Sequence, residues 1–313
     1  MRSLDDAQVA AALPWGALIE SIEKMMVEPA AVAPPRTAHT VPDANGNDAF
    51  FLMKPGWIAG EVIAVKCVTV FPDNGAIDLP MIQAGMLLFD GSNGSLIGAC
   101  EAGELTARRT AAASAVAAKR LARRDARRLL VVGTGAVAPN AVLVHSHVRD
   151  FDSVEVWGRD PEKAAAVVAA VAREGVSASV CDDLDAAVAN ADVISCVTGA
   201  TSPLIKGALL KPGAHLDLIG GFNLGMRESD DDCVRRASIF VDTREDAVLA
   251  GDLAQPLDDG VITADDLIAD LAELVSGHHP GRTSDAEITF FKSAGTALED
   301  LAAASLAFDE ATR

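Results

Sequence analysis

Two closely spaced glycines, Gly133 and Gly135, mark the clearest candidate for a binding site in this sequence. They open the stretch GTGAVA, which follows the apolar run LLVV and precedes a plausible helix. In this pattern the first glycine permits a tight turn, the second lets a diphosphate approach the backbone, and small Ala138 lets helix and strand pack closely. A tight turn with no ligand is the alternative. The flanking strand and helix favour a dinucleotide site, formed by Gly133, Thr134, Gly135, Ala136 and Val137.

The chain about 20 residues after the glycines bears on which dinucleotide would bind, because the next strand should end beside the adenosine ribose. It reads Trp157-Gly158-Arg159-Asp160, with no acid at the strand tip itself. An acid there would bind the 2′-hydroxyl of NAD, whereas Arg159 could neutralise the 2′-phosphate of NADP. Alternatively, Arg159 is solvated and Asp160 caps the next helix. We expect NADPH to be preferred and NADH to be possible, with Trp157 and Arg159 at the site.

Three cations outside the glycine-rich segment occupy positions that surface residues seldom take. Arg36 follows Pro34-Pro35, which restricts the backbone and can aim the side chain. Lys66 interrupts the strand-like run VIAVKCVTVF, and Arg109 opens an otherwise apolar helix. Each could instead be an ordinary surface charge. From the pattern alone, all three are candidate functional residues.

Two kinds of structure must position these side chains. Residues 5–28 have apolar residues at helical spacing, and the prolines from Pro29 end that helix. The next hundred residues contain short apolar runs that predict an antiparallel or mixed sheet: AFFLMK, VIAVKCVTVF, MIQAGMLLFD and SLIGACEAG. Residues 105–121 have the propensity of a helix. After Arg123, strands alternate with helices, which predicts a doubly wound parallel sheet and an α/β fold class. The late run ITFF and the helix after it cannot be placed from periodicity.

The composition limits the classes of function. The chain has 313 residues and is 50% hydrophobic, so it can bury a sizeable core, and its formal charge of −19 disfavours nucleic acid and anionic membranes as partners. No long uncharged apolar run predicts a membrane span, and the acidic N-terminal stretch does not fit a signal peptide. We expect a cytoplasmic protein. Its five scattered cysteines predict neither a disulfide framework nor a metal site, and most should be buried thiols.

Several blocks of the sequence resemble the ornithine cyclodeaminase/μ-crystallin family. They occur in the family's order and span nearly the whole chain: PPRTAHT, VKCVTVFPDN, GELTARRTAAASAVAAKRLA, GTGAVA, WGRDPEKA, GGFNLGMRESD, FVDTREDAVLAGDL and TFFKSAGTALEDLAAA. The resemblance implies a homodimer and a Rossmann domain at residues 115–290. This domain would be inserted in an α+β substrate-binding and dimerisation domain formed by residues 1–114 and 291–313.

The resemblance also implies roles for individual residues. Arg36, Lys66 and Arg109 match the positions that hold a substrate's α-carboxylate, for which an arginine fork is well suited. Lys66 would lie near the reacting carbon and could relay a proton. Asn74 is expected either to line the substrate pocket or only to form a turn. The expected cofactor site also includes Thr110, Thr198, Gly220 and Lys292. Thr110 could bind a phosphate or only its own helix backbone.

Phe222 separates the possible reactions within this family. In the cyclodeaminases the residue after the two glycines is an aspartate that handles the amine proton, and a phenyl ring cannot accept a proton. Asp217 is close in sequence but is expected to point elsewhere. The block GGFNLGMRESD is similar to the form found in ketimine reductases. The resemblance therefore implies NAD(P)H-dependent reduction of a small anionic imine, Δ1-pyrroline-2-carboxylate to L-proline, or the piperideine analogue to L-pipecolate. The alternatives are an ornithine or lysine cyclodeaminase, an amino-acid dehydrogenase and a non-catalytic ligand-binding protein.

Overall fold

The computed structural model describes residues 2–311, which form two compact units. The first contains the chain up to Arg109 and again from Thr296 onward, and the second contains 110–295. Helix α3 (Gly103–Leu121) begins in the first unit and continues into the second. These limits differ by a few residues from the predicted ones at 114/115 and 290/291. Among the described residues, none of the helices is long and apolar enough to cross a membrane.

The first unit is built on a seven-stranded sheet of mainly antiparallel strands. Its order is β1-β7-β6-β5-β4-β2, with β3 also paired to β4. The elements are β1 (Arg2–Leu4), α1 (Asp6–Ala12), α2 (Trp15–Met26), β2 (Ala31–Val32), β3 (Thr37–Pro42), β4 (Asp48–Ile58), β5 (Val62–Val70), the 3-10 turn η1 (Pro72–Ile77), β6 (Ile82–Asp90), β7 (Leu96–Glu101) and α11 (Ala297–Glu310). The predicted mixed sheet is confirmed.

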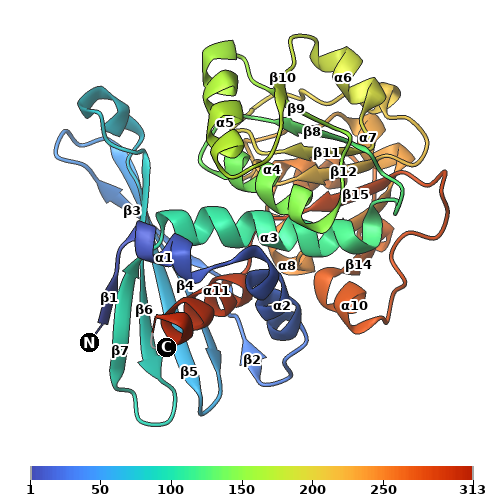
Figure 1. The fold of residues 1–313 in the computed structure, drawn as a ribbon. Coiled ribbons are helices and arrows are strands. Elements are labelled where there is room, and N and C mark those ends of the chain that lie inside the picture. The colour runs from blue at the N-terminus through green and yellow to red at the C-terminus, as the bar shows by residue number, and fades with distance from the viewer. Residues whose placement is uncertain (1, 312–313) are drawn as a thin grey trace. The chain divides into compact units, whose positions relative to one another are not determined.

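Helix α11 returns from the far end of the sequence to cover one face of this sheet (Figure 1). It packs on β4, β5 and β6 and against α2. Its many alanines permit this close approach: Ala297 lies so near Gly56 that a Cβ there would be 3.3 Å from the Ala297 carbonyl oxygen. Side chains alternate across a strand, so every second residue of β4 and β5 faces this helix.

The second unit contains an eight-stranded sheet in which all pairings are parallel. Its order is β10-β9-β8-β11-β12-β15-β13-β14. The strands are β8 (Arg128–Val132), β9 (Ser153–Trp157), β10 (Ser179–Val180), β11 (Val193–Cys196), β12 (His215–Leu218), β13 (Ser238–Val241), β14 (Leu267–Asp270) and β15 (Thr289–Lys292). The remaining elements are α4 (Val137–Val148), α5 (Pro161–Arg173), α6 (Leu184–Asn190), η2 (Gly207–Leu209), α7 (Asp231–Arg236), α8 (Arg244–Ala247), α9 (Gly251–Asp258), η3 (Ala264–Asp266) and α10 (Leu271–Ser276).

Both faces of the parallel sheet are buried, which explains why most residues of its strands are apolar. On β8, Leu129 and Val131 belong to one core cluster, whereas Leu130 and Val132 belong to a cluster on the opposite face. The doubly wound α/β arrangement predicted from the sequence is confirmed. The run ITFF lies in β15, between β12 and β13 inside this sheet. Four of the five cysteines are buried, as expected.

Candidate active-site residues and cofactor hollow

The glycine-rich turn after β8 has the geometry of a dinucleotide site. Gly133 has φ 128°, and a Cβ on it would lie 2.8 Å from the carbonyl oxygen of Val197, so only glycine fits there. A Cβ on Gly135, in contrast, would meet no atom within 4 Å, so that backbone is open to an approaching group. No side chain caps α4, although the N–H of Ala138 donates to the carbonyl oxygen of Gly135 at 3.0 Å and Pro139 has no N–H. Ala138 is fully buried, as close helix packing requires.

A hollow of about 670 Å³ opens beside this turn. It is lined by Gly133, Thr134, Gly135, Trp157, Gly158, Arg159, Asp160, Lys163 and the loop from Val197 to Leu204. Six residues of the predicted cofactor site therefore line it: Gly133, Thr134, Gly135, Trp157, Arg159 and Thr198. Ala136 and Val137 lie next to it, at the start of α4.

The end of β9 supplies the hollow with positive charge. Arg159 and Lys163 are both exposed and both line the hollow. The carboxylate of Asp160 accepts the backbone N–H groups of Glu162 at 3.0 Å and Lys163 at 3.4 Å, so it caps α5 as the alternative interpretation predicted. Gly158 leaves room for Thr134, because a Cβ on it would come within 2.4 Å of the Thr134 methyl group.

Besides Ala136 and Val137, three more predicted cofactor residues do not line the hollow. Lys292 is fully buried, and its Nζ lies 3.2 Å from Oδ2 of Asp252. Gly220 is packed so tightly that a Cβ would lie 1.9 Å from the carbonyl oxygen of Thr198. Thr110 is a mostly buried residue of α3. A sequence motif identifies positions near a site, but it does not separate residues that touch a ligand from those that hold its walls.

In the first unit, Lys66 and Arg109 meet two acids of α11. The Lys66 Nζ atom lies 2.6 Å from Oδ1 of Asp300 and 3.3 Å from Oγ1 of Thr106. Arg109 places Nη1 2.6 Å from Oε2 of Glu299 and Nε 2.7 Å from Oδ1 of Asp300. Lys66 is 2% exposed, Arg109 5%, and both acids 0%. Burying four charged groups costs free energy of folding, and such groups are concentrated at functional sites. We therefore take these residues as a candidate site.

Lys54 adds a third buried cation to this group. It lies directly opposite Lys66 in the pairing of β4 with β5 and is 9% exposed. Like charges on facing positions of a sheet destabilise it. Three buried cations and two buried acids are thus gathered on this face of the sheet. We call Lys54, Lys66, Arg109, Glu299 and Asp300 the charged cluster.

The charged cluster shifts the proton affinities of its members. Burial lowers the pKa of Lys66 to about 7, and the positive charges of Arg109 and Lys54 act in the same direction, against the attraction of Asp300. Burial alone would raise the pKa of Asp300, but Arg109 and Lys66 hold it well below its usual range. At neutral pH, therefore, Asp300 is ionised and Lys66 can give up a proton at small cost.

The sequence did not identify Lys54, Glu299 or Asp300. Lys54 precedes a proline and reads as a strand end, and the two acids read as ordinary first-turn residues of a helix. Only the register of β4 with β5 and the return of α11 bring them to Lys66. The acidic pair does stand out as charge at the start of an otherwise apolar helix, which was the available signal.

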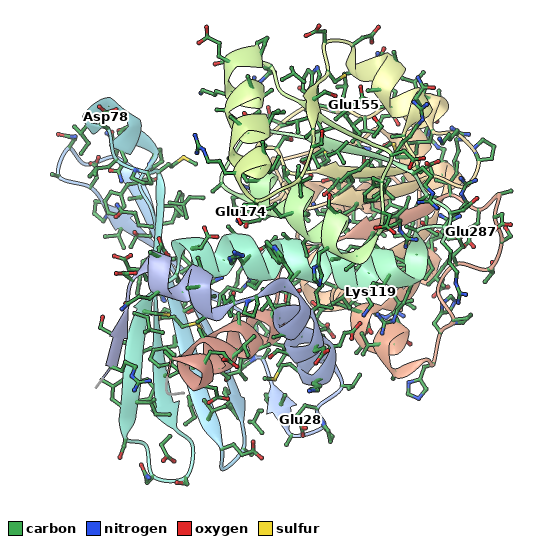
Figure 2. All side chains as sticks on the ribbon, in the orientation of Figure 1. Glu28, Asp78, Lys119, Glu155, Glu174 and Glu287 are labelled. Carbon is green, nitrogen blue, oxygen red and sulfur yellow. The ribbon has the colours of Figure 1, made fainter. Side chains whose placement is uncertain are left out.

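Arg36 and Asn74 are the other two predicted substrate residues. Arg36 is partly exposed and directly precedes β3, whose first residue Thr37 pairs with Met53, so its backbone approaches the level of Lys54. Asn74 lies in η1, and its Nδ2 donates to the carbonyl oxygen of Pro80 at 2.8 Å, which is the turn-forming role. That turn ends at Asp78, with a left-handed φ of 59°, at the tip marked in Figure 2.

Asp217 has no place at either site. It is fully buried in β12, where its Oδ2 accepts the hydroxyl of Ser195 at 2.7 Å and lies 3.4 Å from Nε2 of His145. The expectation that it points elsewhere is confirmed, so it cannot replace the carboxylate missing at Phe222.

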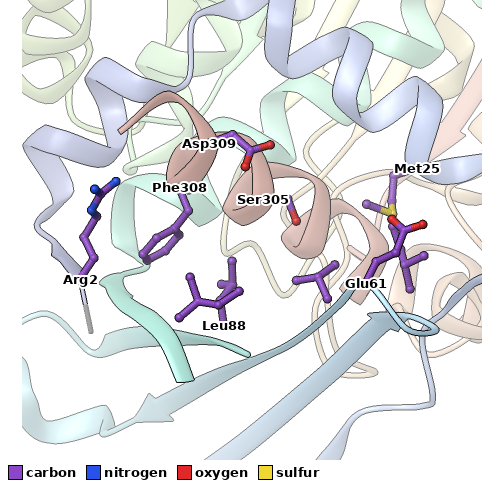
Figure 3. A pocket seen from close by; sticks show the side chains of 10 residues that line it. Arg2, Met25, Glu61, Leu88, Ser305, Phe308 and Asp309 are labelled. Atoms are coloured by element: carbon purple, nitrogen blue, oxygen red, sulfur yellow. The ribbon is translucent and has the colours of Figure 1, made fainter. Parts of the chain in front are cut away.

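A second hollow, of about 870 Å³, lies in the first unit beside the C-terminal half of α11. Leu88 and Phe308 form much of its apolar wall, with Arg2, Glu61 and Asp309 toward its rim (Figure 3). None of the charged cluster lines it. Size alone therefore does not locate the chemistry in this unit.

Comparison with known proteins agrees with these observations. The family model described as the ornithine cyclodeaminase/mu-crystallin family matches residues 5–313. Delta(1)-pyrroline-2-carboxylate reductase of Paracoccus denitrificans is 40% identical over 281 residues, covering 86% of this chain and 88% of that protein. The structure of Thermococcus litoralis Delta(1)-pyrroline-2-carboxylate reductase in complex with NADH and L-proline has a TM-score of 0.94 and 31% identity, covering 100% of this chain and 98% of that one. An archaeal alanine dehydrogenase dimer with bound NAD has a TM-score of 0.91 and 27% identity, covering 99% and 95%. The chain thus belongs to the ornithine cyclodeaminase/mu-crystallin family, as its sequence blocks predicted.

Proposed function

We propose that this protein reduces a cyclic imine carboxylate with a nicotinamide cofactor, and that its substrate is Δ1-pyrroline-2-carboxylate, with L-proline as product. The observation that carries the proposal is the buried charged cluster, in which Lys54, Lys66 and Arg109 lie with two acids. The carboxylate of a substrate would reduce the repulsion between Lys54 and Lys66. The names of the Paracoccus and Thermococcus relatives support the same substrate.

The glycine-rich turn would hold the dinucleotide. The open backbone at Gly135 and the uncapped start of α4 fit a diphosphate, and Arg159 and Lys163 fit the adenosine end. A bound dihydronicotinamide supplies hydride. We propose NADPH as the preferred cofactor and NADH as a weaker one.

Arg159→Ala should lower the preference for NADPH about tenfold, measured as the ratio of kcat/KM for the two cofactors.

The cations would bind the substrate carboxylate and orient the imine. Arg109 offers planar donors for a carboxylate, and Glu299 and Asp300 fix its guanidinium in place. The imine carbon accepts the hydride, the electrons of the C=N double bond become the nitrogen lone pair, and the nitrogen takes up a proton. We assign that proton to the Lys66 ammonium group, whose pKa of about 7 suits a donor at neutral pH.

The test is oxidation of NADPH by the purified protein with Δ1-pyrroline-2-carboxylate, repeated with NADH and with the piperideine analogue. Formation of L-proline should equal the NADPH consumed. Ammonia release from ornithine is the control for the cyclodeaminase alternative, which Phe222 disfavours because it leaves no base at that position. Ammonia release without NADPH consumption would replace this proposal with that alternative.

We also propose that the protein forms a homodimer through the sheet of the first unit. On the face of the sheet opposite α11, strands β4, β5 and β6 present a group of partly exposed apolar residues: Phe51, Met53, Trp57, Ile63, Val65, Leu87 and Phe89. Such an apolar face needs a cover. The alanine dehydrogenase relative is a dimer, and a second copy is the occupant we propose. We also propose that the protein is cytoplasmic, as expected from the sequence.

A further inference from the structure

One wall of the cofactor hollow is a loop whose two ends are held by a single buried residue. The loop runs from Thr198 to Leu204, and Glu228 is 0% exposed behind it. At one end, Oε1 of Glu228 accepts the backbone N–H of Thr198 at 2.6 Å and its hydroxyl at 2.8 Å. At the other end, the carbonyl oxygen of Glu228 accepts the N–H groups of Leu204 at 2.8 Å and Ile205 at 2.9 Å.

The same carboxylate also joins the ends of two neighbouring strands. Its Oε2 accepts the N–H of Gly220 at 2.8 Å and that of Gly221 at 3.4 Å, just after β12, while Thr198 follows β11. A Cβ on Gly220 would lie 2.6 Å from Oε1 of Glu228, so the glycine makes room for the carboxylate. These strands end at the edge of a parallel sheet where dinucleotides bind.

Glu228 is itself held in place by a second carboxylate. Oδ1 of Asp252 accepts the N–H of Glu228 at 2.8 Å and that of Ser229 at 3.0 Å. Oδ2 of Asp252 lies 3.2 Å from Nζ of Lys292, at the end of β15. Lys292, which the sequence placed in contact with the cofactor, thus belongs to the support of the wall.

We propose that Glu228 is a positioning residue for the cofactor, and that its ionised carboxylate holds the 198–204 loop in the conformation that binds the dinucleotide. The inference rests on the proposed use of this hollow. All four groups that the carboxylate contacts are donors, and the ionised carboxylate can accept from all of them at once. Protonation of Oε2 would place an O–H donor against the N–H donors of Gly220 and Gly221.

The charges around Glu228 bring this ionisation near neutral pH. The pKa of Glu228 is raised to about 7 by burial, which Lys292 opposes and the negative charge of Asp252 assists, and the thiol of Cys196 is also close enough to interact. The carboxylate form is therefore gained as pH rises through 7. Cofactor affinity should rise over the same range.

The experiment measures the dissociation constant of NADH by its fluorescence, from pH 6 to 8.5, without substrate. NADH is the probe because the 2′-phosphate of NADPH titrates near pH 6. The wild-type protein should bind NADH more tightly at pH 8 than at pH 6. Glu228→Gln should bind it at least about tenfold more weakly at pH 8 and lose the pH dependence. Glu228→Asp, which keeps the charge, should recover part of both.

Asp217→Asn is the matched control, because Asp217 is an equally buried carboxylate of the second unit that lies away from the hollow. Asp217→Asn should change the thermal stability of the protein without changing the pH dependence of its affinity for NADH. A folded Glu228→Gln variant with wild-type affinity and pH dependence would overturn the inference. If that variant does not fold, a wild-type affinity that is flat from pH 6 to 8.5 overturns it equally. Substrate is absent, so failure of the imine assay is a separate result.

Discussion

The buried ammonium group of Lys66 has an unfavourable electrostatic energy, which the proposed anionic substrate would reduce. It lies near the positive charges of Lys54 and Arg109, and among the described residues Asp300 and the Thr106 hydroxyl are its hydrogen-bond partners. Buried ion pairs often stabilise a fold no more than apolar residues of similar size would. This is why we assign the lysine a role in binding an anionic substrate.

We expect the reductase activity to fall as pH rises through about 7. The pKa of Lys66 is lowered, so its ammonium form is present below that pH and is lost above it. Deprotonation of Lys66 removes both its attraction for the substrate carboxylate and the proposed proton donor. The measurement is the pH profile of kcat/KM for the imine. Lys54→Met should move its alkaline limb to higher pH, because one repulsive charge is removed; an unmoved limb would show that Lys66 does not set it.

Truncation of Arg109 should greatly lower kcat/KM for the imine. Arg109→Ala removes the cation that lies 2.6 Å from Glu299 and 2.7 Å from Asp300, and with it the planar donors for substrate. We expect kcat/KM to fall by about 2–5 kcal/mol of transition-state binding. NADPH affinity and the thermal midpoint of the second unit serve as controls. A folded variant with near-normal kcat/KM would remove Arg109 from the site.

Sequence reasoning identified the two cations of this site that lie within family blocks, but not their partners. Lys66 and Arg109 are unusual because they interrupt apolar segments, and such interruptions are visible in one dimension. Lys54 and Asp300 acquire meaning only from strand register and from the return of α11, which join residues 234 positions apart. No local pattern encodes such long-range pairing.

At the level of elements, the strand–turn–helix unit of β8 and α4 followed the sequence closely, because its glycines, apolar strand and small packing residue are all local. The place of β15 could not be predicted. A short apolar run identifies a strand, but it does not say which strands lie beside it. The position of β15 between β12 and β13 is set by the tertiary packing of the whole sheet.

Two glycines of the second unit should respond oppositely to the same substitution. Gly135→Ala places a methyl group where no atom lies within 4 Å, so the thermal midpoint should stay within about 2 °C while NADPH affinity falls at least about tenfold. Gly207→Ala places a Cβ 2.2 Å from the backbone of Asp232 and Cys233, so the midpoint should drop by several degrees with affinity retained by the folded fraction. Calorimetry and fluorescence titration separate the two. Equal losses of stability in both variants would contradict the assignment of Gly135 to ligand approach.

For the whole molecule, the apolar face of the first sheet determines the expected assembly. Sedimentation should give twice the chain mass of 32.4 kDa. Val65→Glu, at the centre of that face, should shift the protein to monomers, because a charge would be buried in the contact. Ile268→Glu is the control, since Ile268 is 41% exposed on β14 of the other unit and should leave the dimer intact. A Val65→Glu protein that stays dimeric would place the contact elsewhere.

The return of α11 to the first unit also has a consequence for synthesis on the ribosome. Glu299 and Asp300 are translated after the whole second unit, whereas Lys54 and Lys66 are translated before it. Until then, the nascent chain carries these lysines without those two acids. The charged cluster can therefore form only after the second unit has been synthesised, so a chain that stops within that unit lacks two members of the cluster.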